Sequence, residues 1–235
     1  MSLVEVTIIL AVLAVLTAVA APSLGSYMND AAAAKAKTDV ETIGSALSRM
    51  LTDTGEPWVL QDGNGATAAD APTRDAANRV DLLVSAGNVP ALGVSRSSGT
   101  PDWNAAVVDA SGVQRLEYFL VQNTPGGLAA NGYRTAVNMT TSANFDPDSG
   151  GTFNSEFGWR GAYLPGPLGP DPWGNRYAVN VEFLAKALGA GPSGNVNDVF
   201  VVSAGLNGSV ETRFDTDGIT AGGDDIIFVV SGGTR

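Results

Sequence analysis

The sequence lacks cysteine and histidine altogether, and it contains few charged residues. Without cysteine no disulfide can form, although a chain of 235 residues can bury a core without one. The absence of histidine removes the commonest general base and the commonest transition-metal ligand. Charged residues make up 16% of the chain, and 24 acidic against 13 basic residues give a net charge of −11. An acidic chain disfavours nucleic acid as a partner, because phosphate binding needs a basic face.

Sequence motifs of common enzyme classes are also missing. The chain contains no GxxxxGK[ST], no HExxH and no GxSxG, and no dinucleotide-binding fingerprint follows a predicted strand. We therefore predict that the protein is not an enzyme.

The long apolar run of the chain lies at the N-terminus. No charged residue occurs between Val6 and Asn29, and about 20 apolar residues in a helix are enough to cross a bilayer. Glu5 lies among the apolar residues at the start of this stretch, between Val4 and Val6, where an ionised carboxylate is costly unless it is paired. The nearest available cation is an α-amino group, either that of its own chain or that of a neighbouring subunit. Two alternatives are a signal peptide, which fits the Ala-rich residues 18–21 but lacks a basic residue before Lys35, and a plain anchor, which does not require Glu5.

The N-terminal helix is expected to continue well past the apolar run. Strong helix formers follow Asp30, and an amphipathic stripe comes after them. The stripe consists of Val40, Ile43, Leu47, Met50 and Leu51. The turn sequence at residues 53–57 ends the pattern, so one helix of about 50 residues, roughly 75 Å long, is predicted. Its second half is apolar on one side only, which predicts docking on a globular domain. Pro22 should kink or loosen its first half.

The rest of the chain predicts a small sheet with long loops. A loop is expected over residues 55–75 and a short helix over residues 75–86. Strands are expected at residues 116–121, 133–139, 177–183, 198–203 and 226–230. The predicted fold class is α+β, with the long helix packed on a small antiparallel β-sheet and an enlarged loop region at about residues 55–165.

A second distinctive stretch precedes the strand expected at residue 177. It reads Asp171-Pro-Trp173-Gly-Asn175, and a proline-rich approach leads into it. On the residues alone its role is structural, with Asp171 as a turn or capping residue and Trp173 as an anchor in the core.

Together these features resemble the type IV pilins and the pseudopilins of type II secretion. At the N-terminus the resemblance is carried by Met1, Glu5, the apolar run at residues 6–21 and Pro22. The DPWGN sequence at residues 171–175 resembles the signature of the major pseudopilin, where it leads into a small antiparallel sheet.

The resemblance implies a pilin-like fold and a structural role in a helical filament of identical subunits. Residues 1–29 would form a hydrophobic helix that lies in the inner membrane before assembly and in the filament core afterwards, and residues 30–235 would form the globular domain. Met1, Glu5 and Pro22 would serve assembly, with Glu5 pairing with the N-terminal amine of an adjacent subunit. A prepilin peptidase and assembly machinery are implied partners, and the filament would be an extracellular type IV pilus or a periplasmic pseudopilus. The rival function is a monomeric, single-pass, membrane-anchored extracellular binding module.

The turn between the last two predicted strands is acidic and rich in glycine. Its flanks, residues 203–208 and 222–226, resemble the calcium loop of major pseudopilins. Calcium takes about six to eight oxygen ligands, and glycine lets a chain fold back around an ion. The candidate ligands are Asp217, Asp224 and Asp225, followed by Asn207 and Asp215. A bound calcium ion would tie the last strand to the preceding one, as a disulfide does in many pilins, and the alternative is a solvated acidic turn.

Overall fold

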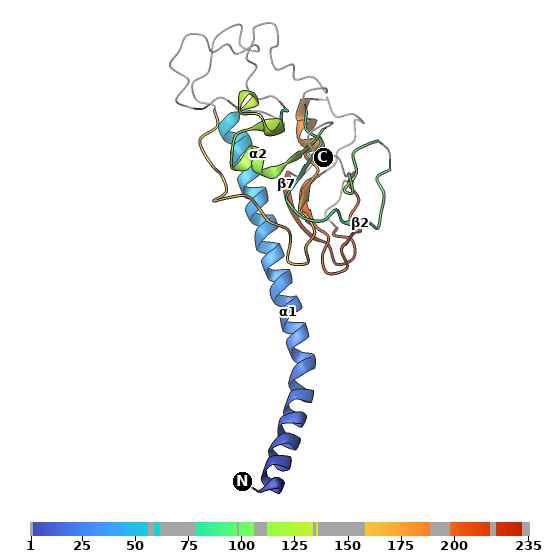
Figure 1. Ribbon diagram of the computed structural model, residues 1–235. Coiled ribbons are helices and arrows are strands. Elements are labelled where there is room, and N and C mark those ends of the chain that lie inside the picture. Colours follow the sequence, from blue (N-terminus) through green and yellow to red (C-terminus); the bar gives the residue numbers. More distant parts are fainter. Residues whose placement is uncertain are drawn as a thin grey trace, which may run out of the picture.

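The computed structural model describes residues 2–55, 59–61, 79–97, 99–105, 112–133, 135, 158–188, 198–216 and 220–231. The helices are α1 (Leu3–Thr54) and α2 (Leu116–Leu120), with the 3-10 helices η2 (Pro125–Gly127), η3 (Ala129–Asn131) and η5 (Val181–Leu188). The strands are β1 (Leu82–Val84), β2 (Ala91–Leu92), β3 (Val113–Arg115), β4 (Ala178–Val179), β5 (Val199–Ser203), β6 (Ser209–Val210) and β7 (Ile226–Ser231). Figure 1 shows α1 extending far beyond a body that holds all of these strands.

α1 confirms the long helix that the sequence predicts, and both of its ends are capped. It has 52 residues. At its start Ser2 and Glu5 form a capping box, in which the Ser2 hydroxyl accepts from a first-turn amide and the Glu5 carboxylate accepts from the Ser2 N–H. At its end Gly55 has a left-handed φ of 70° and donates its N–H to the Leu51 carbonyl. The helix runs through Pro22 without interruption and curves along its length (Figure 1).

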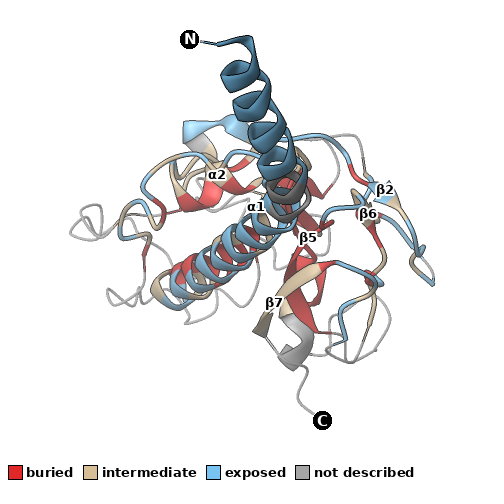
Figure 2. Cartoon of the chain, turned by 90° about the horizontal axis from the view of Figure 1, so that it is seen from below, coloured by how far each residue is buried: buried red, intermediate tan, exposed pale blue. Residues whose placement is uncertain are grey.

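The two halves of α1 have different surroundings. Side chains at residues 2–18 and 24–31 are exposed. In the second half one face is buried, and this face includes Ala36, Val40, Ile43, Leu47 and Met50. Figure 2 shows the exposed first half projecting from the body and the buried face of the second half turned towards it. The predicted docking of the second half is therefore confirmed.

The body is built on a five-stranded sheet with the strand order β3-β1-β4-β5-β7. β1 and β3 are parallel, with Leu82 opposite Val113, whereas the other three pairs are antiparallel. The sheet is therefore mixed, and the prediction of an antiparallel sheet is wrong at this edge. The physical reason is the long crossover at residues 85–112, which returns the chain in the direction of β1. β2 and β6 form a separate parallel pair.

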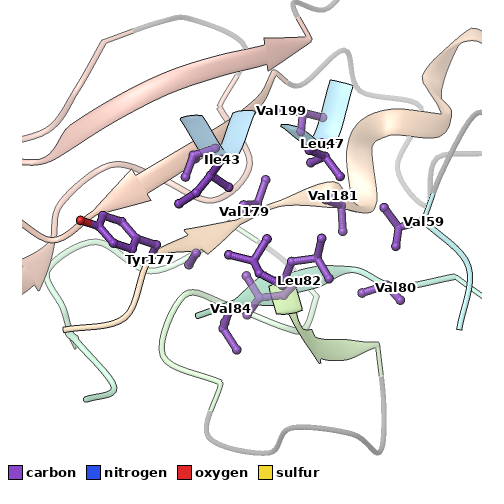
Figure 3. Packing of buried hydrophobic residues seen from close by; sticks show 14 of the residues in the cluster. Ile43, Leu47, Val59, Val80, Leu82, Val84, Tyr177, Val179, Val181 and Val199 are labelled. Atoms are coloured by element: carbon purple, nitrogen blue, oxygen red, sulfur yellow. The ribbon is translucent and has the colours of Figure 1, made fainter. Parts of the chain in front are cut away.

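The hydrophobic core lies between α1 and the sheet. Figure 3 shows Ile43 and Leu47 of α1 packed over Val179 and Val199 of the sheet. Gly44 permits the close approach of α1 to β7, because a Cβ at this position would overlap the ring of Phe228.

An aromatic cluster covers the opposite face of the sheet. Since Phe228 faces α1, the neighbouring residues of β5 and β7, including Phe200, point to the other face. There the ring centroid of Trp103 lies 5.4 Å from that of Phe200 and 4.7 Å from that of Phe214. Trp103 is fully buried, whereas Trp173 is only half buried. The prediction of Trp173 as the core anchor is therefore wrong, and Trp103 has that role.

Two predicted elements have a different secondary structure. Residues 82–84, expected to be helical, form β1, whose three side chains are all buried. A short apolar run that is buried on both faces has no period that separates helix from strand. Residues 116–120, expected to be a strand, form α2. Its buried residues, Leu116, Phe119 and Leu120, have the three- and four-residue spacing of a helix, and this spacing was present in the sequence.

The later strands agree better with the sequence. The strand expected at residues 177–183 is shortened to β4 because η5 begins at Val181. β5 and β7 confirm the last two predicted strands. Residues 134 and 136–139 of another predicted strand lie outside the described residues, as do residues 62–75 of the predicted loop.

Candidate functional site

The exposed half of α1, which we define as residues 3–28, carries a large apolar surface. Thirteen large apolar side chains on it are exposed by 40% or more. They are Leu3, Val4, Val6, Ile8, Ile9, Leu10, Val12, Leu13, Val15, Leu16, Leu24, Tyr27 and Met28. A contiguous exposed apolar surface is typical of a binding site. Among the described residues, no helix combines the length and the apolar character that crossing a membrane requires.

Glu5 lies at the tip of this surface and is already engaged within its own chain. Its Oε2 accepts a hydrogen bond of 2.8 Å from the Ser2 backbone N–H. The capping bond leaves Oε1 without a hydrogen bond in the described part of the chain. Met1, the other predicted assembly residue at this end, lies outside the described residues. The capping box was missed by the sequence analysis, although the Ser-x-x-Glu spacing is its signature.

Pro22 lies in the middle of α1, and its backbone is helical. Because proline has no N–H, the carbonyl of residue 18 loses its usual helical partner. The side chain of Pro22 is outside the described part of the chain. The predicted loss of helical hydrogen bonding before Pro22 concerns the assembled filament and stays a prediction. A filament map with a straight, continuous helix from residue 12 to residue 29 would contradict it.

Asp225 anchors the acidic turn, which we define as residues 204–225, between β5 and β7. Its Oδ2 accepts hydrogen bonds of 2.8 Å from the Glu211 N–H and 2.6 Å from the Thr212 N–H. Its Oδ1 is buried and has no hydrogen bond to any residue that the structure describes, and burial raises the pKa of this carboxyl. A buried oxygen without a partner is a candidate ligand for a cation.

Asp224 and Asn207 close the mouth of the acidic turn. Asp224 Oδ2 accepts a hydrogen bond of 2.9 Å from the Asn207 N–H. The two ends of the turn come close together here. This is possible because Gly205 has a left-handed φ of 64° and no Cβ, which would overlap the Asp224 carbonyl. The structure therefore brings three of the predicted ligands, Asp224, Asp225 and Asn207, to the same region of the turn.

The other two predicted ligands do not complete a site. Asp215 accepts hydrogen bonds from the backbone and hydroxyl of Ser97, and its Oδ1 lies 3.5 Å from Arg213 Nε. Asp217 lies outside the described residues. Across the described ranges, no group of three or more acidic side chains is arranged to hold a metal ion. The residues present fit calcium only in part, and the calcium site stays a prediction.

A buried ion pair that the sequence analysis did not single out lies near the turn. Arg96 and Glu182 are 7% and 3% exposed, and their two hydrogen bonds measure 2.6 and 2.9 Å. The Arg96 guanidinium also lies 4.9 Å from the ring centroid of Phe214 and 5.7 Å from that of Phe183. The two hydrogen bonds to the Glu182 carboxylate and the neighbouring phenylalanine rings compensate for the lost hydration of the guanidinium. The signal in the sequence was a lone acidic residue in an apolar segment.

Asp81 belongs to the same charged region. Its Oδ1 lies 3.2 Å from Arg79 Nε. Burial, and after it the charge of Glu182, raise the pKa of the Asp81 carboxyl to about 6, although Arg79 opposes this shift. These charges join β1, η5 and the segment around Arg96, so their role is to hold the body together.

Asp171 confirms the turn role predicted for the DPWGN sequence. Its Oδ1 accepts hydrogen bonds of 3.0 Å from the Trp173 N–H and 2.8 Å from the Asn175 N–H. Its Oδ2 accepts a hydrogen bond of 2.8 Å from the Ser203 hydroxyl of β5. The carboxylate therefore shapes the turn and fixes it to the sheet.

The features of the structure that bear on function are the exposed half of α1, Glu5 and the acidic turn. Comparison of the chain with protein-family models, with curated proteins and with solved structures gives no match.

Proposed function

We propose that this protein is a structural subunit, a pilin or pseudopilin, that polymerises with identical copies into a helical filament through the exposed half of α1. The observation that carries the proposal is the division of α1. Its second half docks on the sheet, whereas residues 3–28 extend from the body with exposed apolar side chains.

The free energy of burying these side chains supports association. Full burial of a large apolar side chain contributes about 1.5–3 kcal/mol, and roughly half of that remains to be gained on α1. Summed over the thirteen exposed side chains, the gain is on the order of 10–20 kcal/mol. Association costs about 4–15 kcal/mol in lost freedom of motion. Packing of the exposed half against other copies is therefore favourable over most of these two ranges.

The shape of the subunit favours a filament over a closed oligomer. The exposed half of α1 is apolar on all sides, so one neighbour cannot cover it completely. Several copies must surround each helix, and they contact it with different surfaces. Such heterologous contacts generate open helical assemblies when the rotation between subunits does not close.

Glu5 has the assembly role in this proposal. Its Oε1 has no hydrogen bond to a described residue and would pair with the α-amino group of an adjacent subunit, while Oε2 keeps the capping bond to Ser2. Removing one partner of a buried ion pair costs about 3–5 kcal/mol, because the remaining charge is left uncompensated. The pair therefore favours one axial position of each subunit. The membrane-held precursor, the prepilin peptidase and the assembly machinery that the resemblance implies belong to the same proposal.

The test compares fibres sheared from cells that produce the wild-type chain, Glu5→Ala or Glu41→Ala. Glu41 is a matched control, because it is exposed on the second half of α1. Fibres are expected from wild type and Glu41→Ala, and few or none from Glu5→Ala. A normal fibre yield from Glu5→Ala would contradict the role of Glu5. Recovery of the wild-type chain only as a detergent-soluble monomer would contradict the filament proposal and favour the rival function, a membrane-anchored binding module.

A further inference from the structure

The chain contains three Asn-Gly pairs, at residues 64–65, 131–132 and 207–208. In such a pair the backbone nitrogen of the glycine can attack the side-chain amide of the asparagine, because glycine carries no side chain that would hinder the approach. The first pair lies outside the described residues. The structure describes the other two, and their surroundings differ.

The pair Asn207-Gly208 lies at the exposed tip of the acidic turn. Asn207 is exposed, and Leu206 before it is 56% exposed. Gly208 has a left-handed φ of 69°, and its N–H donates no hydrogen bond to any described residue. The attacking nitrogen therefore has no hydrogen bond in the described part of the chain to break before it reacts.

The side chain of Asn207 is folded back over this nitrogen. Its Oδ1 accepts a hydrogen bond of 2.7 Å from the Ser209 N–H, which is the geometry of an Asx turn. The same hydrogen bond stabilises the negative charge that develops on Oδ1 when the amide carbon Cγ is attacked. The turn therefore supplies both an unengaged nucleophile and a donor to the developing oxyanion.

The pair Asn131-Gly132 is held by its surroundings. The Gly132 N–H donates a hydrogen bond of 3.3 Å to the Ala129 carbonyl, and the Asn131 N–H donates one of 3.0 Å to the Leu128 carbonyl. The backbone at Gly132 is also packed, because a Cβ there would lie 2.6 Å from the Asn123 carbonyl oxygen. Cyclisation at Asn131 would have to break these hydrogen bonds and move this backbone.

We propose that Asn207 is a site of spontaneous deamidation in the folded protein, whereas the fold protects Asn131. The Gly208 nitrogen forms a bond to Asn207 Cγ, and its proton leaves with the side-chain NH2 group as ammonia, so a cyclic succinimide results. Water then adds to either carbonyl carbon of this ring and breaks the bond from that carbon to the nitrogen. The product is aspartate or isoaspartate at position 207. The reaction consumes only water, and the chain gains a negative charge.

The added charge would lie between two carboxylates. Asn207 Nδ2 donates a hydrogen bond of 3.3 Å to Glu211 Oε2, and the Asn207 backbone N–H donates one of 2.9 Å to Asp224 Oδ2. In aspartate an acceptor replaces the Nδ2 donor, so the hydrogen bond to Glu211 becomes a repulsion between like charges. Isoaspartate also lengthens the main chain next to Gly208, whose carbonyl accepts from the Ala91 N–H of β2. Deamidation should therefore loosen the acidic turn.

The test follows both asparagines in the same sample. The full chain, dispersed in detergent, is incubated at mildly alkaline pH, and peptide mapping by mass spectrometry measures the conversion at each site over time. Asn207 is expected to convert several-fold faster than Asn131 in the folded protein. In guanidinium chloride the two rates should converge, because no fold then protects Asn131. Equal rates in the folded protein, or an Asn207 that converts only in denaturant, would overturn the inference.

A second measurement tests the effect on the turn. In the presence of a chelator, Asn207→Asp is expected to lower the melting midpoint by more than Asn207→Ala does. Asn207→Ala is the matched control, because it loses the same side-chain hydrogen bonds without adding a charge. Equal midpoints for the two variants would overturn the proposed loosening by the added charge.

Discussion

Among single residues, Asp81 is expected to make the stability of the body depend on pH. Its pKa is raised from 3.8 to about 6, first by burial and then by the charge of Glu182. The folded protein therefore binds more protons than the unfolded chain between these two values. The free energy of unfolding should fall as the pH rises from about 4 to about 6, because the ionised carboxylate is disfavoured in the fold.

Asp81→Asn removes this titration and should flatten the decline. Denaturant unfolding at a series of pH values measures it. Glu41→Gln is a matched control, because it removes an exposed carboxylate of α1, and it should keep the wild-type slope. An unchanged slope in Asp81→Asn would show that other groups cause the pH dependence.

A second prediction at the residue scale concerns the contribution of the Arg96–Glu182 ion pair to stability. Glu182→Gln leaves a buried guanidinium without its carboxylate, so the free energy of unfolding should fall by about 3–5 kcal/mol. Replacing both residues, as Arg96→Met with Glu182→Leu, should recover most of this loss, because no charge is then buried. A double-mutant cycle of Arg96→Met, Glu182→Leu and the variant with both, measured by denaturant unfolding, gives the coupling energy. Strictly additive losses would show that the two side chains are not coupled.

Among the secondary-structure elements, the contact of α1 with β7 depends on one glycine. Gly44→Ala improves the helix propensity by about 1 kcal/mol, but its Cβ would overlap the Phe228 ring. Overpacking of this kind costs about 1–3 kcal/mol, so a net loss of up to about 2 kcal/mol in the free energy of unfolding is expected. Gly25→Ala is the control, because a Cβ there meets no atom within 4 Å. Stabilisation by Gly44→Ala would contradict the close approach.

The next prediction concerns the effect of calcium on the stability of the acidic turn. If Asp225, Asp224 and Asn207 contribute to a calcium site, millimolar calcium should raise the melting midpoint relative to a chelator, because the ion binds only the folded state. Asp224→Ala should erase this difference, whereas Asp215→Asn should keep it, since Asp215 faces Ser97 instead. Calorimetry measures the melting midpoint. A midpoint that does not respond to calcium would contradict the calcium site and favour the alternative, a solvated acidic turn.

For the molecule as a whole, we expect folding and association to depend on different parts of the chain. A chain of residues 30–235 keeps the docked half of α1 and loses the apolar side chains exposed at residues 3–28. We expect it to be monomeric in sedimentation at concentrations where the full chain associates. Its melting midpoint should stay within about 4 °C of that of the dispersed full chain, equivalent to roughly 1 kcal/mol or less. Association of the shortened chain would place the interface on the body.

Helix α1 could be predicted from the sequence because its signals are local. The apolar run, the stripe that begins at Val40 and the stop near Gly55 lie in one continuous segment, and helical spacing needs no distant partner. β5 and β7 were predictable for a similar reason, since both are apolar runs bounded by turn residues. The turn role of Asp171 also follows from its immediate neighbours.

The remaining features depend on residues that meet only in the folded chain. Burial on both faces makes residues 82–84 a strand, and the long crossover sets the parallel pairing of β1 with β3. The partners Arg96 and Glu182 are 86 residues apart, and the contact of Asp215 with Ser97 spans 118 residues. No local pattern encodes such pairs, because their free energy is gained only when the core brings them together and excludes water from them.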